Sequence, residues 1–263
     1  MKGNTSEDRS DFKAGVFLVD KPVGVSSFAV IRWVRKLIGI KKVGHAGTLD
    51  PFATGLLVVC AGRPATRMID SFMGGVKAYE AVLQLGVATD TLDTEGAVTT
   101  IEPVVRLNQT EIDACLQSFI GEGLQAPPAY SAVKYKGKPL YHYARKGVVI
   151  IKPPRVINIH SIDFISYDLA TGQLKFSVLC GKGVYIRVLA ADIANKLGTC
   201  GHLTALRRTR CGNFFVERAV LGNKLSSLSY TDFIRDHMMS TEEALAMNSE
   251  KEYITSGAPD CHL

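Results

Sequence analysis

The sequence predicts an α+β fold, in which a mixed, largely antiparallel sheet is flanked by helices. Strand-like and helix-like segments interleave along the 263 residues, but without the regular strand–helix–strand spacing of a doubly wound parallel sheet. Apolar residues make up 46% of the chain, which is enough to bury a sizeable core. The chain is longer than a median domain, yet its 263 residues could form one large α+β unit, and the sequence contains no internal repeat.

The first third of the chain supplies buried strands and a capped helix. Gly15–Val19 (GVFLV) is a short apolar run that ends at the turn DKPVG. Ser26 and Ser27 can cap a helix over 28–38, whose apolar residues recur at helical spacing. GLLVVCAG predicts a second buried strand, ATRMIDSFM a short helix and AYEAVLQLGV a further strand. The following ATDTLDTEG lacks the ligand spacing and the glycine of a calcium-binding loop, and is interpreted as a polar loop.

The later part of the chain alternates strands, helices and one irregular stretch. Thr110 with Asp113 predicts a capping box for a helix. Gly121–Pro154 shows no regular pattern and is rich in proline, glycine, lysine and tyrosine. RVINIHSIDFISYD and QLKFSVLC are expected to be strands, and VYIRVLAADIANKLG a helix. Ser240 with Glu243 predicts the cap of one last short helix.

Charge and cysteine usage limit the functional class. Lys and Arg outnumber Asp and Glu by 31 to 25, a net charge of +6, which favours an anionic partner. None of the six cysteines forms a Cys-x-x-Cys pair, so neither a zinc knuckle nor a redox dithiol is indicated. They are interpreted as reduced thiols of an intracellular protein. Because the sequence has no apolar signal region and no apolar run of membrane-spanning length, we expect a cytoplasmic protein.

One block, Val43–Leu57 (VGHAGTLDPFATGLL), frames a single carboxylate. Asp50 is followed at once by a proline, and two upstream glycines permit backbone shapes that other residues resist. An Asp before a proline often only bonds its own backbone in a turn, and this alternative stays open. The buried strand that follows would instead present Asp50 from a rigid anchor, as a nucleophile or a general base. No second acid lies beside it to form a glycosidase-type pair.

Two further residues could work with this carboxylate. His45 lies in the same block, where the His-x-Glu spacing of a zinc deaminase is missing, and it could also be an ordinary loop histidine. Arg187 stands in the apolar segment GVYIRV, where an arginine is costly unless it is paired. It could form a structural ion pair with any acid, or it could pair with Asp50 and hold that carboxylate ionised.

Tyrosines and cations interleave over Gln125–Gly147 (QAPPAYSAVKYKGKPLYHYARKG). Four tyrosines and five cations in one proline-rich stretch favour stacking on bases and binding of phosphates, and hence RNA, over a solvated loop. The segment LRRTRCGNF adds Arg207, Arg208 and Arg210. These arginines are interpreted as phosphate contacts, with a basic surface turn as the alternative.

Six stretches, in this order, resemble the TruB family of tRNA pseudouridine synthases: LVDKPVGVSSF, KVGHAGTLDPFATGLLVVCAG, AYEAVLQLGVATDTLDTEG, QAPPAYSAVKYKGKPLYHYARKG, GVYIRVLAADIANKLG and HLTALRR. The resemblance runs from about Gly15 to Phe215, and GHAGTLDPFATGLL is a very specific block. It implies the pseudouridine synthase fold with an inserted RNA-clamping loop over 121–154. It also implies isomerisation of uridine 55 in the tRNA T-loop to pseudouridine, through an aspartate nucleophile acting on a flipped-out base.

The resemblance implies a role for each residue that matches a family motif. Asp50 would be the nucleophile, and Arg187 would pair with it. Tyr79 of AYEA would stack under the target base and assist the later proton removal. His45 of GHAG would help to hold the loop once the base is turned out.

Five more residues are expected to support or bind the substrate. Tyr185 and Leu206 match family positions that line the uracil pocket. Lys21 of the DKP motif would support the catalytic loop, and we count it with the substrate-binding residues. Lys134 of the insertion and Arg207 of HLTALRR are expected to contact the RNA. The sequence contains no motif for a cofactor or a metal, and we expect neither.

The chain is expected to comprise a flexible N-terminus (1–14), a catalytic domain (15–225) and a short C-terminal tail (226–263). The tail would stand in place of the PUA-type module that many family members carry. The expected partner is the T-arm stem-loop of tRNA, bound by a monomer without an obligatory protein partner and without a membrane. Two other hypotheses stay open: a guide-RNA-directed relative acting on ribosomal RNA, and an RNA-binding or RNA-folding protein whose catalysis is secondary or lost. The intact catalytic residues argue against such a loss.

Overall fold

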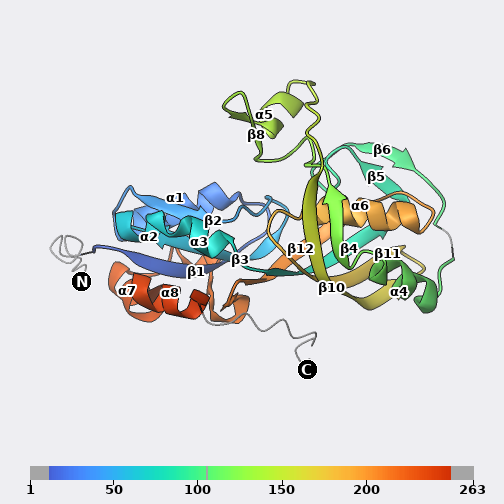
Figure 1. Ribbon diagram of the computed structural model, residues 1–263. Coiled ribbons are helices and arrows are strands. Elements are labelled where there is room, and N and C mark those ends of the chain that lie inside the picture. Colours follow the sequence, from blue (N-terminus) through green and yellow to red (C-terminus); the bar gives the residue numbers. More distant parts are fainter. Residues whose placement is uncertain (1–11, 105, 250–263) are drawn as a thin grey trace. The chain divides into compact units, whose positions relative to one another are not determined.

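The computed structural model describes residues 12–104 and 106–249 (Figure 1). The expectations for 1–11 and for 250–263, which include most of the flexible N-terminus and the end of the tail, lie outside the described residues. Within the described part of the chain, no helix has the length and apolar character that crossing a membrane requires.

The chain divides into two compact units. Unit 1 contains the described residues 12–79 and 207–249, and unit 2 contains 80–206. Unit 1 is therefore assembled from two distant stretches of sequence, whereas unit 2 is one continuous stretch.

The sheet of unit 1 is mixed, as expected. β1 (Gly15–Lys21) pairs antiparallel with β3 (Thr54–Ala61) along its whole length. β2 (Val43–Ala46) pairs antiparallel with β3, while β12 (Gly201–Cys211) joins β3 in parallel. On its other side, β1 pairs in parallel with β14 (Val220–Leu221). Two short antiparallel strands complete the sheet, β13 (Phe214–Phe215) on β12 and β15 (Met238–Met239) on β1.

Both faces of β1 are buried. Alternation along the strand sends Phe17 and Val19 into one core cluster and Val16 and Leu18 into another. Because both clusters exclude water, helices must cover both faces of this strand. The first cluster is closed by α1 (Ser27–Ile38) and α7 (Tyr230–His237), and the second by α2 (Arg63–Arg67), α3 (Ile69–Met73) and α8 (Thr241–Ser249). Two single-turn 3₁₀ helices, η1 (Val216–Arg218) and η2 (Gly222–Lys224), connect the later strands.

The strands of unit 2 follow the order β12-β4-β11-β10-β7. Their limits are Lys77–Leu85 for β4, Gln173–Cys180 for β11, Arg155–Asp168 for β10 and Gly121–Gln125 for β7. β10 pairs antiparallel with both of its neighbours. α4 (Gln109–Gln117) packs on β10 and on α6 (Ile186–Lys196). Five small elements complete the unit: the hairpin β5 (Val87–Thr89) and β6 (Val98–Ile101), and the inserted β8 (Lys134–Tyr135), β9 (Lys138–Pro139) and α5 (Leu140–Ala144).

The local signals at helix ends and in the long strands are largely confirmed. Ser26 is the N-cap of α1, and its hydroxyl accepts from the Ala29 amide. Ser240 and Glu243 form a reciprocal capping box at the start of α8. β10 and β11 have the limits that their sequences predict.

The capping box of α4 lies two residues earlier than expected. Asn108 and Glu111 exchange the two hydrogen bonds, at 2.9 and 3.0 Å, so the expected pair Thr110 and Asp113 is wrong. The reason is reach, because the third helical residue must fold its carboxylate back onto the cap amide, and Glu is one methylene longer than Asp.

Three other stretches differ from expectation. The first five residues of Gly121–Pro154 are the strand β7, which pairs with β10 despite its two glycines. ATRMIDSFM forms two short helices that meet at Met68. The basic LRRTRC is the end of β12 rather than a surface turn. Beyond residue 226, α7 and α8 add Phe233 and Ala244 to the cores of unit 1.

Candidate active site

The hairpin between β2 and β3 carries Asp50. Its loop is tight, since the Ala53 amide donates to the Asp50 carbonyl oxygen at 3.1 Å. Leu49 and Phe52 turn into the interior, at 4% and 6% exposed, whereas Asp50 is half-buried. The apolar side chains thus anchor the loop and leave the carboxylate partly accessible.

Groups near the start of α1 fix the backbone on both sides of Asp50. The Ser27 hydroxyl accepts from the Leu49 amide and donates to the Leu49 carbonyl oxygen, both at 2.9 Å. The Gly24 amide donates to the Pro51 carbonyl oxygen at 2.8 Å. Both chain neighbours of Asp50 are therefore held by hydrogen bonds, which limits the positions that the carboxylate can take.

Lys21, at the end of β1, is fully buried. Its ammonium group donates to the carbonyl oxygens of Val25 at 2.7 Å, Pro22 at 3.0 Å and Pro51 at 3.2 Å. A buried ammonium needs such acceptors, because desolvation without them is costly. The bond to Pro51 ties β1 to the residue after Asp50. This placement fits support of the loop and leaves the ammonium no exposed surface for a substrate.

Arg208 braces the same loop from β12. Its side chain is 1% exposed and donates to the Leu56 carbonyl oxygen from Nε at 2.8 Å and to the Gly47 carbonyl oxygen from Nη2 at 3.1 Å. Gly55 has φ +101°, and a Cβ there would overlap the backbone of Arg208. Because it is buried, Arg208 supports the loop and is not the surface phosphate contact that we expected.

His45 lies on β2, close enough to Arg208 for the positive charge of that arginine to affect the pKa of the imidazole. Burial lowers the pKa of the imidazole below its ordinary value, and the positive charge of Arg208 lowers this pKa further. A hydrogen bond with the backbone of Gly47 opposes these two effects but does not outweigh them. The ring is therefore neutral at pH 7.

Arg207, expected among the RNA contacts, is joined to Asp20 of β1. Its Nη1 and Nη2 donate to the two carboxylate oxygens at 3.1 and 2.7 Å, which makes a bidentate pair. The Arg207 side chain is 39% exposed, so part of the guanidinium is open to solvent.

Tyr79 lies on β4 and is 8% exposed. It belongs to unit 1, as Asp50 does. Its stacking under a target base stays a prediction.

In unit 2, Arg187 occupies the first turn of α6 and is 3% exposed. Its Nη1 lies 3.4 Å from the Asp93 carboxylate and donates to the Thr91 carbonyl oxygen at 2.6 Å. Its Nη2 donates to the Tyr130 carbonyl oxygen at 2.8 Å. Asp93 lies in the stretch expected to be a polar loop, yet it is 2% exposed. The pairing of Arg187 with Asp50, which belongs to unit 1, stays a prediction.

Tyr185 precedes Arg187 by two residues and is held by Gln125. The Tyr185 amide donates to the Gln125 side-chain oxygen at 2.7 Å, and the Gln125 amide group donates to the Tyr185 carbonyl oxygen at 3.1 Å. Gln125 is buried at the end of β7, which fixes the start of α6 to this strand. Leu206, on β12, is 7% exposed.

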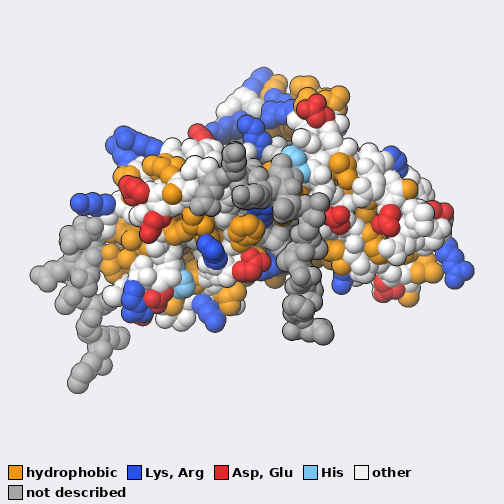
Figure 2. All heavy atoms as spheres, turned by 60° about the horizontal axis from the view of Figure 1, so that its bottom comes forward, with side chains coloured by type: hydrophobic (Ala, Val, Ile, Leu, Met, Phe, Trp, Pro, Cys, Tyr) orange, Lys and Arg blue, Asp and Glu red, His pale blue; other side chains and the backbone are white. Residues whose placement is uncertain are grey.

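The insertion between β7 and β10 carries β8, β9 and α5, which project from the rest of unit 2 in Figure 1. Lys134 is exposed. The Tyr135 ring packs edge-on against Tyr143, with centroids 5.8 Å apart, and the Lys152 ammonium lies 4.8 Å from the Tyr135 centroid. Figure 2 shows lysine and arginine side chains beside apolar ones on this projection. Tyrosines and cations thus share one surface, as the sequence predicts.

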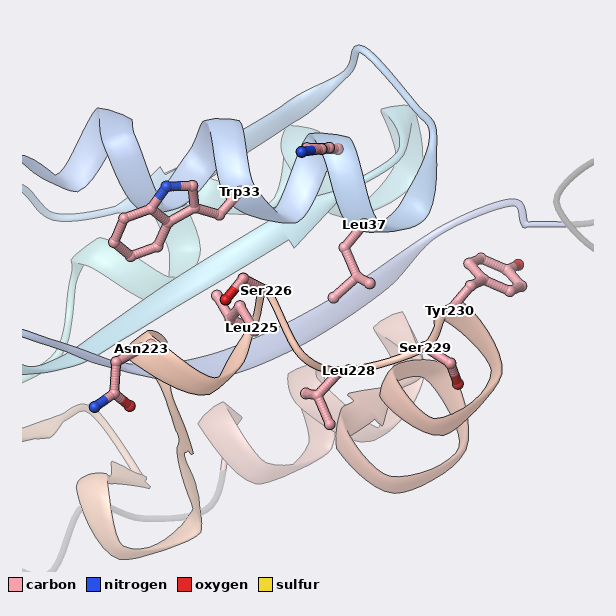
Figure 3. A pocket seen from close by; sticks show the side chains of 10 residues that line it. Trp33, Leu37, Asn223, Leu225, Ser226, Leu228, Ser229 and Tyr230 are labelled. Carbon is pink, nitrogen blue, oxygen red and sulfur yellow. The ribbon is translucent and has the colours of Figure 1, made fainter. Parts of the chain in front are cut away.

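A groove of about 540 Å³ lies between α1 and the segment 222–230 (Figure 3). Trp33 and Leu37 line it from α1, and Leu225 and Leu228 line it from the opposite segment. Its lining contains no carboxylate, histidine or cysteine and none of the expected site residues. Across the described residues, no three His, Cys, Asp or Glu side chains gather as a metal site would require.

Family models match almost the whole described chain. One, for the N-terminal domain of TruB family pseudouridylate synthases, matches residues 35–186, and another, for the C-terminal domain of tRNA pseudouridylate synthase B, matches 187–246. The chain belongs to the TruB family. The expected fold and family are thereby confirmed.

Two curated TruB relatives are both named tRNA pseudouridine synthase B. The protein of Desulfotalea psychrophila is 55% identical over 216 residues, which cover 81% of this chain and 88% of the relative. That of Clostridium tetani is 43% identical over 220 residues, which cover 84% of this chain and 75% of the relative.

Solved structures share the fold. A crystal structure of a Cbf5-Nop10-Gar1 complex matches with a TM-score of 0.63 and 28% identity, over 84% of this chain and 56% of the other. A structure of an H/ACA RNP bound to a substrate RNA containing 2'-deoxyuridine matches with a TM-score of 0.66 and 24% identity, over 93% and 64%. This TruB chain spans less than two thirds of either matched chain.

Proposed function

We propose that this chain isomerises uridine 55 in the T-loop of tRNA to pseudouridine, with Asp50 as the nucleophile acting on a flipped-out base. The observation that carries the proposal is the loop of Asp50. Hydrogen bonds from Ser27, Gly24 and Lys21 hold the residues on both sides of a partly accessible carboxylate, in a chain of the TruB family. Such pre-organisation suits a group that must meet one atom of a substrate.

The reaction fits a site built on one carboxylate. Uridine and pseudouridine are isomers: the bond from N1 to C1′ breaks, a bond from C5 to C1′ forms, and the proton on C5 is replaced by one on N1. The change involves no net oxidation or reduction. Turning the base out costs a few kcal/mol. Stacking on Tyr79 would offset this cost, since a base on an aromatic ring gains about 1–3 kcal/mol.

The remaining site residues have assigned roles in this proposal. Arg187 pairs with Asp50 and keeps it ionised, while its contacts with Asp93 and two carbonyl groups orient the guanidinium. Tyr185, which Gln125 holds in place, lines the uracil pocket with Leu206.

Two further roles concern the loop itself. His45 stays neutral and helps to hold the loop after base flipping. Lys21 supports the loop from β1 through its bond to Pro51.

The RNA partner of this proposal is the T-arm stem-loop. Lys134 and the other cations of the insertion bind its phosphates, and the exposed part of Arg207 adds a contact. The enzyme acts as a cytoplasmic monomer without an obligatory protein partner, and it uses neither metal nor cofactor.

The deciding experiment incubates the protein with an unmodified tRNA transcript and maps pseudouridine by carbodiimide-stop sequencing. We expect one stop at position 55, and none with Asp50→Asn, which still binds the tRNA. Retained turnover in Asp50→Asn would remove the nucleophile assignment. A parallel reaction with ribosomal RNA and guide RNA tests the guide-directed alternative. Binding without any product from the wild-type protein would favour an RNA-folding role.

A further inference from the structure

We propose that the exposed face of α1 is a second RNA-contact surface, which binds the sugar-phosphate backbone of the substrate beside the Asp50 loop. This surface, the α1 stripe, consists of Phe28, Arg32, Arg35 and Lys36. The proposal rests on the proposed function, because it concerns the same RNA, and it adds a contact site outside the catalytic residues and the insertion.

The four side chains lie along one side of the helix. Phe28, Arg32 and Lys36 follow one another at intervals of four residues and are exposed, while Arg35, three residues after Arg32, is half-buried. Phe28 is 56% exposed although it is a large apolar residue. The guanidinium carbons of Arg32 and Arg35 lie 5.9 and 5.6 Å from the centroid of its ring. The ring and the two cations are thus gathered into one cluster.

The segment from position 21 to position 49, which includes α1, carries charges of one sign only. Between positions 21 and 49 there is no Asp or Glu, and there are six cations: Lys21, Arg32, Arg35, Lys36, Lys41 and Lys42. Exposed helices usually alternate signs, because pairs of opposite charge three or four residues apart are favourable. A one-sign helix with an exposed aromatic ring is instead suited to an anionic partner that offers flat rings as well as charge, which describes RNA.

Hydrogen bonds connect the α1 stripe to the candidate active site. Ser27, next to Phe28, bonds both backbone groups of Leu49, the neighbour of Asp50. Arg35 Nη2 donates to the Val43 carbonyl oxygen at 2.9 Å, at the start of the same motif. The backbone that carries the α1 stripe is thus hydrogen-bonded to the motif that carries Asp50, within unit 1.

The length of the stripe suits a short run of phosphates. At about 1.5 Å of rise per residue, the eight steps from Phe28 to Lys36 span about 12 Å. A duplex strand carries one phosphate per about 3.4 Å of axis, so the stripe can follow three or four nucleotides.

The test uses a double variant, Arg32→Gln with Lys36→Gln, and a matched control, Arg218→Gln with Lys224→Gln. All four cations are exposed residues of unit 1, and both variants lower the net charge by two. Arg35 is left intact because it also holds Val43. Binding of an unmodified tRNA transcript is measured across a range of salt concentrations, and pseudouridine formation is measured at saturating tRNA.

The α1 double variant should bind about tenfold more weakly near 0.1 M salt, with a salt slope flatter by about two, and its kcat should be unchanged. Phe28→Ala should weaken binding without changing the slope, because the ring carries no charge. The control should behave as the wild type. The proposal would be overturned if the α1 double variant bound tRNA with the wild-type affinity and salt slope, as expected if the stripe serves only a protein partner. An equal loss of affinity in the control variant would also overturn it. If the wild type binds with this charge dependence but forms no pseudouridine, the proposed function fails and the RNA surface stands.

Discussion

Ser27→Ala should damage catalysis through the backbone of the Asp50 loop. The Ser27 hydroxyl is buried and makes two hydrogen bonds of 2.9 Å to the amide and the carbonyl of Leu49. The substitution strands both groups in the interior, where each unsatisfied group costs about 1–3 kcal/mol. We expect the free energy of unfolding to fall by about 3 kcal/mol. A shift of about 1 Å in the position of Asp50 would lower kcat about 100-fold, while tRNA affinity persists.

Ser26→Ala is the matched control, one residue away. Ser26 caps α1 by accepting from the Ala29 amide at 3.2 Å, and losing such a cap costs about 1 kcal/mol. It should lower stability without lowering kcat, because neither neighbour of Asp50 loses a partner. Urea unfolding gives the free energies, single-turnover pseudouridine formation gives the rates, and amide exchange at Leu49 reports the loop. A Ser27→Ala protein that is as stable as Ser26→Ala and turns over at the wild-type rate would refute this role of Ser27.

Two other outcomes are expected. Replacing Lys134, Lys136 and Lys138 of the insertion with glutamine should weaken tRNA binding. It should also flatten the salt dependence of binding by up to about three in slope, because each phosphate contact releases counterions. An unchanged slope would mean that the insertion is an ordinary solvated surface. The pKa of His45 is lower in the folded protein than in the unfolded chain. Below about pH 6.5 the unfolded chain therefore binds a proton on this imidazole more readily than the folded protein does, and the free energy of unfolding decreases as the pH is lowered. Urea midpoints at pH 7 and pH 5 should therefore differ less in His45→Gln than in the wild type, and an equal difference would contradict this assignment.

The parts of the fold that local sequence determines could be predicted. The caps of α1 and α8 depend on residues within three positions of each other, and β10 and β11 are bounded by turn residues. The capping box of α4 shows how precisely such local signals locate the start of a helix. Two overlapping pairs, Asn108 with Glu111 and Thr110 with Asp113, fit the pattern, and only side-chain length separates them.

Apart from Lys21, for which the family resemblance implied this role, the supports of the candidate site could not be predicted, because their partners are far apart in sequence. Arg208 reaches Gly47 across 161 positions. Arg187 meets Asp93, and nothing in the sequence selects that acid from the others. The sequence showed only that a buried arginine needs partners. In the structure, backbone carbonyl groups accept hydrogen bonds from both Arg187 and Arg208. Every residue has a backbone carbonyl group, so the sequence does not indicate which ones will be the acceptors.

The divided sequence of unit 1 has a consequence for synthesis on the ribosome. β1 can pair with β3 soon after it emerges, but its other edge waits for β14 and β15, which come about 200 residues later. At about 5–20 residues per second, that edge stays unpaired for about 10–40 s. Unit 2 is translated in the meantime as one uninterrupted stretch, so it can fold first. The nascent chain therefore holds an open strand edge that other chains could join, and a chaperone that shields this edge would raise the yield of folded protein.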